Sequence, residues 1–67
     1  MGPTDKFIKL YIPNIEEVLN NWGFVPNSRE RNIKLAEIIA WINNFRPSEI
    51  EYAIKIMENI QYYDDNR

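Results

Sequence analysis

The sequence contains neither cysteine nor histidine among its 67 residues. Without cysteine the chain can form no disulfide, no thiolate metal site and no thiol nucleophile. Without histidine it lacks the usual general base near neutral pH and the commonest metal ligand. Only Gly2 and Gly23 supply glycine, so there is no Gly-rich phosphate-binding loop. We therefore predict a protein that is not an enzyme, with no catalytic residue, no metal ligand and no cofactor.

Long apolar runs are also missing. No run approaches the roughly 20 residues that cross a bilayer, and no signal-peptide pattern is present. The sequence thus predicts a cytoplasmic protein with no membrane partner. We interpret residues 1–4 as a remnant of cloning and residues 64–67 as a polar, frayed tail. A cloning remnant would leave open whether the native protein is longer.

Positive charge is scarce and scattered. Eight Lys and Arg residues stand against ten Asp and Glu residues, which gives a formal net charge of -2. Modules that bind nucleic acid usually present a basic face to the phosphates. The one basic cluster is Arg29, Arg31 and Lys34, beside Glu30. We interpret it as the solvated start of a helix, and a nucleic-acid partner is disfavoured.

The carboxylates come in pairs, which could indicate acid–base chemistry. The pairs are Glu16 and Glu17, Glu49 and Glu51, and Asp64 and Asp65. Glycosidase chemistry needs two carboxylates that face each other across a cleft. We interpret the first two pairs as charges in the first turns of helices, where they suit the helix dipole, and the third as part of the tail.

One local pattern, Pro followed by Asn or Ser and then Glu three residues later, occurs three times. The segments are Pro13–Asn14–Ile15–Glu16–Glu17, Pro26–Asn27–Ser28–Arg29–Glu30 and Pro47–Ser48–Glu49–Ile50–Glu51. Such a side-chain oxygen accepts from a backbone N–H of the first turn, and the Glu reaches back to the cap. The pattern predicts helices that begin near residues 15, 28 and 49.

Apolar spacing supports these helices. The expected core faces are Ile15, Val18, Leu19 and Trp22 in the first, Leu35, Ile38, Ile39, Ile42 and Phe45 in the second, and Ile50, Ala53, Ile54, Met57 and Ile60 in the third. Gly23 is the candidate left-handed residue after the first helix, and Phe24 and Val25 should fold back onto the core. The short link between residues 28–45 and 49–62 predicts an antiparallel hairpin. We predict one all-α domain over residues 1–67, a small three- to four-helix bundle.

Residues 5–12 fit two structures. Ile8, Leu10 and Ile12 alternate as in a strand, whereas Phe7, Ile8, Tyr11 and Ile12 fit a helix. A lone strand would have no partner in a helical chain. We favour a short helix that ends before Pro13.

The two long helices carry more apolar residues than their packing against each other requires. Tyr52, Ile56 and Tyr63 lie beside the core arc of the third helix, and Trp41 flanks that of the second. The second helix also carries a smaller stripe, Ile33, Ala36 and Ala40. Either the first helix and residues 7–12 cover these positions, or part of the set binds a partner. The predicted partner-binding residues are Trp41, Tyr52, Ile56, Tyr62 and Tyr63.

Residues 41–63 carry a resemblance to a known family. The segment Trp41–Ile42–Asn43–Asn44–Phe45 is followed by Glu49, Ala53, Met57, Ile60 and Tyr62–Tyr63. This pattern resembles the N-terminal helical segment of bacterial phosphoribosyltransferase-like proteins of conflict and defence systems. The acidic pyrophosphate-binding loop of that family has no counterpart here. The resemblance implies a helical accessory module and no catalytic residue.

Together these observations predict a non-catalytic protein–protein interaction or assembly module, which is either a protein of its own or a domain excised from a larger protein. It would bind a protein partner or form a homodimer. The alternative is a nucleic-acid-binding domain of helix-turn-helix type that uses Arg29, Arg31, Lys34 and Arg46.

Overall fold

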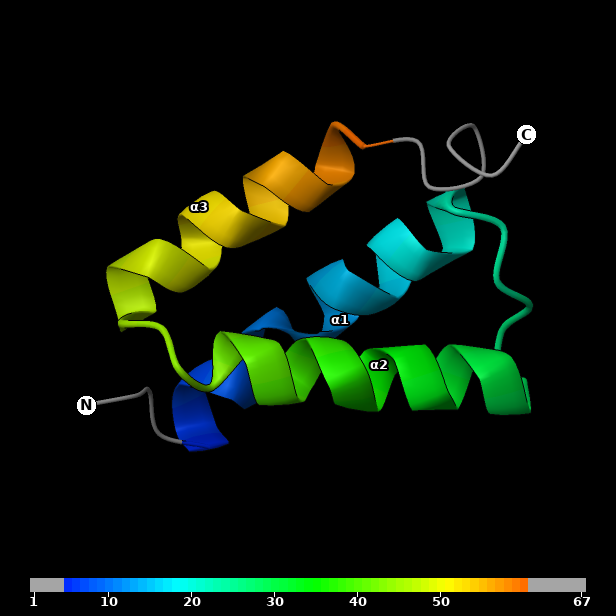
Figure 1. The fold of residues 1–67 in the computed structure, drawn as a ribbon, viewed down its shortest axis with the longest axis horizontal. Helices are drawn as coiled ribbons and strands as arrows, with labels where there is room; N and C mark the ends of the chain where they lie inside the picture. The colour runs from blue at the N-terminus through cyan, green and yellow to red at the C-terminus, as the bar shows by residue number, and fades with distance from the viewer. Residues whose placement is uncertain (1–4, 61–67) are drawn as a thin grey trace.

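A computed structural model describes residues 5–60, and within them the chain forms three α-helices and no strand. They are α1 (Asp5–Asn21), α2 (Arg29–Ile42) and α3 (Pro47–Glu58). Helix α1 contacts both α2 and α3, which run in opposite directions and splay apart (Figure 1). The predicted small helical bundle is therefore confirmed. The predictions for residues 1–4 and 64–67 lie outside the described residues.

Helix α1 is longer than the sequence pattern predicted. It continues through Pro13, so the short helix that ends before Pro13 and the second start near residue 15 were both wrong. Proline removes one backbone donor and strains the preceding turn. However, Ile8 and Ile15 lie two turns apart on one face and are both buried, so packing on either side of Pro13 keeps the helix continuous. Asn14 lies inside the helix and caps nothing.

The end of α1 follows the prediction. Gly23 has φ 101°, a left-handed conformation that glycine adopts without a Cβ clash. The Gly23 N–H donates to the Asn20 carbonyl and the Phe24 N–H donates to the Leu19 carbonyl, both at 3.0 Å. These two bonds form a Schellman motif. The turn directs Phe24 back onto the core as predicted, whereas Val25 is exposed.

Helix α2 begins where the capping pattern placed it. Ser28 is the N-cap, and its hydroxyl accepts from the Arg31 N–H at 3.1 Å. The helix ends at Ile42, three residues before the predicted Phe45. The chain tightens there, because the Phe45 N–H donates to the Ile42 carbonyl at 2.8 Å.

Helix α3 begins two residues earlier than predicted. Its N-cap is Arg46, not Ser48, and Pro47 occupies the first turn, where a missing N–H costs nothing. The Glu49 carboxylate accepts from the Arg46 N–H at 2.7 Å, which is the reciprocal half of a capping box. The helix ends at Glu58, four residues before the predicted Tyr62.

The core forms where α1 meets the other two helices. Its buried members are Ile15, Val18, Leu19, Trp22, Ile38, Ile42, Ile50, Ile54 and Met57. All four predicted core residues of the first helix are buried, while Ile60, predicted to be core, is 41% exposed. The Trp22 indole N–H donates to the Ile60 carbonyl at 2.9 Å. This bond joins the C-terminal ends of α1 and α3.

Two leucines of α1 provide a matched test of this core. Leu19 is fully buried and Leu10 is 64% exposed. We expect Leu19→Ala to lower the free energy of unfolding by about 3 kcal/mol or to unfold the domain, because it leaves a cavity in the core. Leu10→Ala should change it by less than about 0.5 kcal/mol. Urea unfolding followed by circular dichroism measures both, and equal effects would contradict the assigned packing.

Pro13 offers a test of the continuous helix. Pro13→Ala should raise the free energy of unfolding by about 1–3 kcal/mol, since alanine restores an N–H for the Lys9 carbonyl and removes the ring clash. Thermal unfolding by circular dichroism measures the change. A lower melting temperature in the variant would mean that the native fold depends on an interruption of the helix at residue 13.

Candidate partner-binding groove

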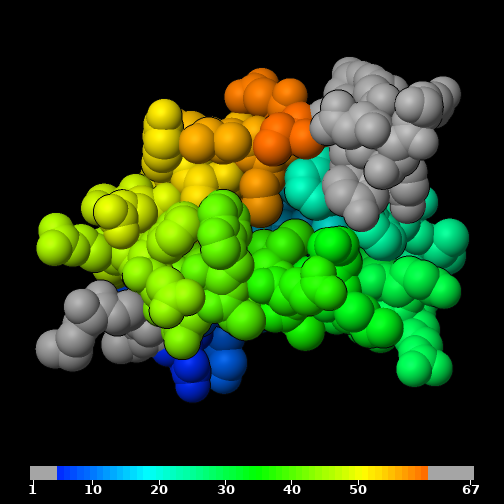
Figure 2. All heavy atoms as spheres, in the orientation of Figure 1, coloured from blue at the N-terminus to red at the C-terminus, as the bar shows by residue number. Residues whose placement is uncertain are grey.

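The space between α2 and α3 contains two adjacent hollows, which we call together the α2–α3 groove. The first has a volume of about 300 Å³ and is lined by Trp41, Phe45, Glu49, Tyr52, Ala53 and Ile56. The second has about 330 Å³ and is lined by Trp22, Lys34, Glu37, Ile38, Trp41, Met57 and Ile60. Trp41 lines both, so the hollows are neighbours along the two helices. In Figure 2, the side chains of α2 and α3 make most of the visible face, and α1 is largely hidden behind them.

Large apolar side chains of the groove reach the surface. The exposed fraction is 48% for Trp41, 68% for Tyr52 and 45% for Ile56. The Trp41 ring packs edge-on against Phe45, one helical turn away, with ring centroids 4.8 Å apart. This contact fixes the Trp41 ring at the boundary between the two hollows.

Helical periodicity explains why these residues remain outside the core. On α2, Ile38 and Ile42 are buried in the core, and Trp41 lies to one side of them. On α3, Ile50 and Ile54 are buried in the same way, and Ile56 lies to one side. No residue of α1 lines either hollow. Trp22, which follows α1 directly and was predicted to belong to the first helix, does line the second hollow. Trp41, Tyr52 and Ile56 nevertheless stay exposed, so the first helix does not cover them.

Three of the five predicted partner-binding residues, Trp41, Tyr52 and Ile56, are brought together around one hollow. Tyr62 and Tyr63 lie outside the described residues. Partner binding by all five stays a prediction.

The sequence did not indicate every residue of the groove, and one apolar stripe that it did indicate lies elsewhere on α2. Ile60 was predicted as a core residue but is exposed and lines the groove, because the chain leaves the helical path before it. Phe45 packs against the core as predicted and also lines the groove. The small stripe of Ile33, Ala36 and Ala40 is exposed on α2 and lines neither hollow. Asn43 and Asn44, at the end of α2, and Asn59, at the end of α3, could have indicated that both helices end earlier than predicted.

The groove has an acidic rim. Glu37 lies on the α2 wall and Glu49 on the α3 wall. Lys34 is in the same hollow as Glu37 and forms an ion pair with it, Nζ to Oε1, at 3.0 Å. The lining therefore carries two carboxylates and one ammonium group, which is already paired.

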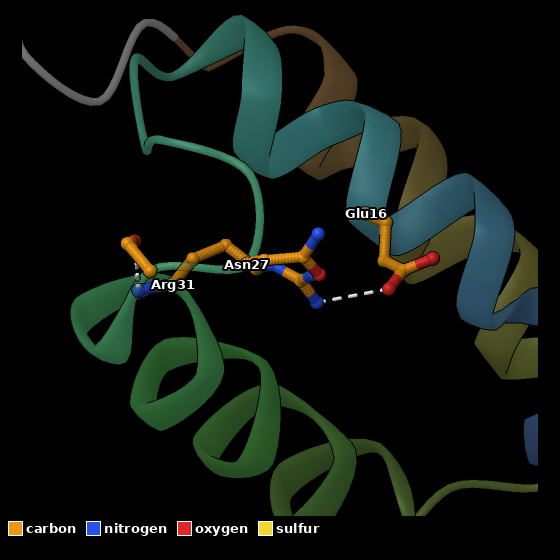
Figure 3. A network of polar contacts seen from close by, with 4 residues as sticks. Glu16, Asn27 and Arg31 are labelled. Carbon is orange, nitrogen blue, oxygen red and sulfur yellow. Dashed lines mark hydrogen bonds and ion pairs between the residues drawn. The ribbon is translucent and has the colours of Figure 1, made fainter.

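Arg31 is buried, although the sequence suggested a solvated helix start. It is 8% exposed, and its Nη1 donates to Glu16 Oε2 at 2.8 Å while Nη2 donates to Asn27 Oδ1 at 2.9 Å (Figure 3). A buried guanidinium is tolerated only when such partners replace water. Asn27 has φ 60°, which asparagine tolerates better than most residues. The interpretation of the basic cluster was wrong for Arg31, and Glu16 lies in the middle of α1 rather than in a first turn.

Another group of titratable side chains surrounds a third hollow. This hollow of about 300 Å³ between α1 and α3 is lined by Tyr11, Asn14, Glu51, Ile54, Lys55 and Glu58. Residues 5–60 contain no cluster of three or more potential metal ligands. Among the same residues, no helix combines the length and apolar character that crossing a bilayer requires.

No protein-family model, curated protein or solved structure matches the chain. The resemblance of residues 41–63 to the helical segment of phosphoribosyltransferase-like proteins therefore stays a prediction. Function is inferred from the groove and its surroundings alone.

The Arg31 network can be tested with two adjacent carboxylates. Glu16→Gln should lower the free energy of unfolding by about 1 kcal/mol, because it weakens the bond to a buried guanidinium. Glu17→Gln is the control, since Glu17 is exposed and its replacement removes the same charge. Urea unfolding at low and high salt measures both. An equal effect of the two substitutions would mean that the ion pair adds nothing to stability.

Proposed function

We propose that this chain is a non-catalytic protein-interaction module whose α2–α3 groove binds a segment of a partner. The observation that carries the proposal is the cluster of Trp41, Tyr52 and Ile56 around one hollow, each about half exposed or more. Trp and Tyr combine a large contact area with few rotatable bonds, and they are enriched among residues that dominate binding energy.

The size of the apolar surface supports this proposal. Trp41, Tyr52, Ile56 and Ile60 each leave about half of a large side chain exposed. At about 100 Å² each they present roughly 400 Å² in total. The largest apolar patch of a typical monomer measures about 300–600 Å² and often marks a functional surface. On a chain with a total accessible surface of 5015 Å², this patch is a substantial part.

The carboxylates support a non-catalytic role. Glu16 binds Arg31, Glu37 binds Lys34 and Glu49 accepts from the Arg46 N–H. Each of these three groups has a structural task in the fold. The nucleic-acid alternative requires Arg31, which is buried and bound to Glu16. A cytoplasmic location belongs to the same proposal.

The test uses a double substitution in the groove. If the wild-type chain retains partners from an extract of the source cells, Tyr52→Ala with Ile56→Ala should abolish their binding. If the wild-type chain self-associates in sedimentation velocity, the same double variant should be monomeric. The helical circular dichroism signal should survive, because both side chains lie outside the core. The melting temperature should fall by no more than about 4–8 °C, the shift that corresponds to about 1 kcal/mol in a domain of this size.

The matched control is Leu10→Ala with Ile33→Ala. These side chains are 64% and 49% exposed, close to the 68% and 45% of the test pair, but lie outside the groove. The control should keep the association that the test variant loses. If the test variant unfolds, its residues are structural; if both variants lose association equally, the groove is not the binding surface. Either result refutes the proposal.

A further inference from the structure

We infer that the occupant of the α2–α3 groove is a single amphipathic helix of another protein, with Lys or Arg beside its apolar stripe. This inference rests on the proposed function and adds the chemistry of the partner. Three properties of the groove support it: its shape, the charge of its rim and its apolar area.

The shape of the groove suits one helix. Its walls are helices of 14 and 12 residues, which at 1.5 Å per residue are about 18–21 Å long. Two hollows of about 300 and 330 Å³ follow each other along this length and share Trp41. An amphipathic helix presents large side chains at positions i, i+3 or i+4, and i+7, which can fill such consecutive hollows. Helix α1 packs against the same two helices from the core side, so an occupant of the groove would lie on the side of α2 and α3 where both hollows open.

The rim charge specifies the polar flank of that helix. Glu37 and Glu49 lie on opposite walls of the groove, and Lys34 is paired with Glu37. The lining thus carries an excess of carboxylate, and the whole chain has a net charge of -2. Complementary charge speeds encounter and disfavours wrong partners. A basic residue beside the apolar stripe would meet Glu49, for which the described residues supply no ion pair.

A second copy of the chain fits these properties less well. Obligate homodimers bury about 1,000 Å² or more per subunit, with a more apolar surface than other interfaces. The groove offers roughly 400 Å² of exposed apolar side chain. Two copies would also bring acidic rims together. The area corresponds instead to a contact with a separate partner that dissociates.

The experiment uses two synthetic helical peptides as long as α2. Both carry leucine at i, i+4 and i+7, and their flanking positions are all Lys in one peptide and all Glu in the other. Each is titrated into the isotope-labelled chain, and resonances of Trp41, Tyr52 and Ile56 are followed by NMR. Leu10 and Ile33, which are exposed outside the groove, report non-specific binding. We expect the Lys peptide to shift the groove resonances alone, with an affinity that falls as salt rises.

Matched variants locate the contacts. Ile56→Ala should lower the affinity for the Lys peptide by about fivefold or more, since a few apolar side chains supply most of the binding energy in such grooves. Ile33→Ala, with similar exposure, should not. Glu49→Gln should weaken it by about two- to fivefold, because an exposed ion pair is lost while an acceptor for the Arg46 N–H remains. Glu51→Gln is the charge control, because Glu51 lines the hollow between α1 and α3.

The outcomes separate this inference from the proposed function. Equal or tighter binding of the Glu peptide overturns the basic partner, and shifts at Leu10 and Ile33 overturn the groove as the helix site. Self-association of the wild-type chain that Ile56→Ala abolishes, without peptide binding, identifies a second copy as the occupant. That result overturns the helix but leaves the interaction groove. If neither peptide binds, the chain stays monomeric and the double variant retains every partner, both proposals fail.

Discussion

The apolar face of α1 is the surface on which both other helices pack. Ile15 and Leu19 are completely buried and Val18 nearly so, and α1 contacts both α2 and α3. A chain this short buries only about 60% of the surface that its unfolded form exposes, so losing one such face would remove most of the core. The continuity of α1 through Pro13 follows from the same constraint, because Ile8 on the far side of the proline is also buried.

The groove is a consequence of this arrangement. Each of the two short helices uses one face, Ile38 and Ile42 on α2 or Ile50 and Ile54 on α3, to pack into the shared core. The adjacent face of each helix then borders a seam that α1 does not reach. Trp41 and Tyr52 lie on those adjacent faces. An interaction surface can therefore be placed there without removing any side chain from the core.

Polar contacts orient the helices that apolar packing brings together. Arg31, in the first turn of α2, binds Glu16 on α1 and Asn27 in the connecting turn. This network fixes where α2 starts relative to α1. At the other end of the fold, the Trp22 indole N–H donates to the Ile60 carbonyl. This bond fixes where the end of α3 lies relative to the end of α1. Directional bonds at these two places complement non-directional burial, which alone would permit several alignments of short helices.

The sequence by itself determined the helical class, the start of α2 near residue 28, the Gly23 termination and the core face of α3 from Ile50 to Met57, because these depend on local backbone chemistry and on 3.6-residue periodicity. It also singled out Trp41, Tyr52 and Ile56 as apolar residues beyond one seam. Only the tertiary structure decided that α1 continues through Pro13 and that Arg31 is buried. Both depend on partners distant in sequence: burial of Ile8 outweighs the local cost of proline, and Glu16 compensates the desolvation of a guanidinium. The openness of the groove was likewise decided in three dimensions, because periodicity gives the direction of a side chain but not which neighbour covers it.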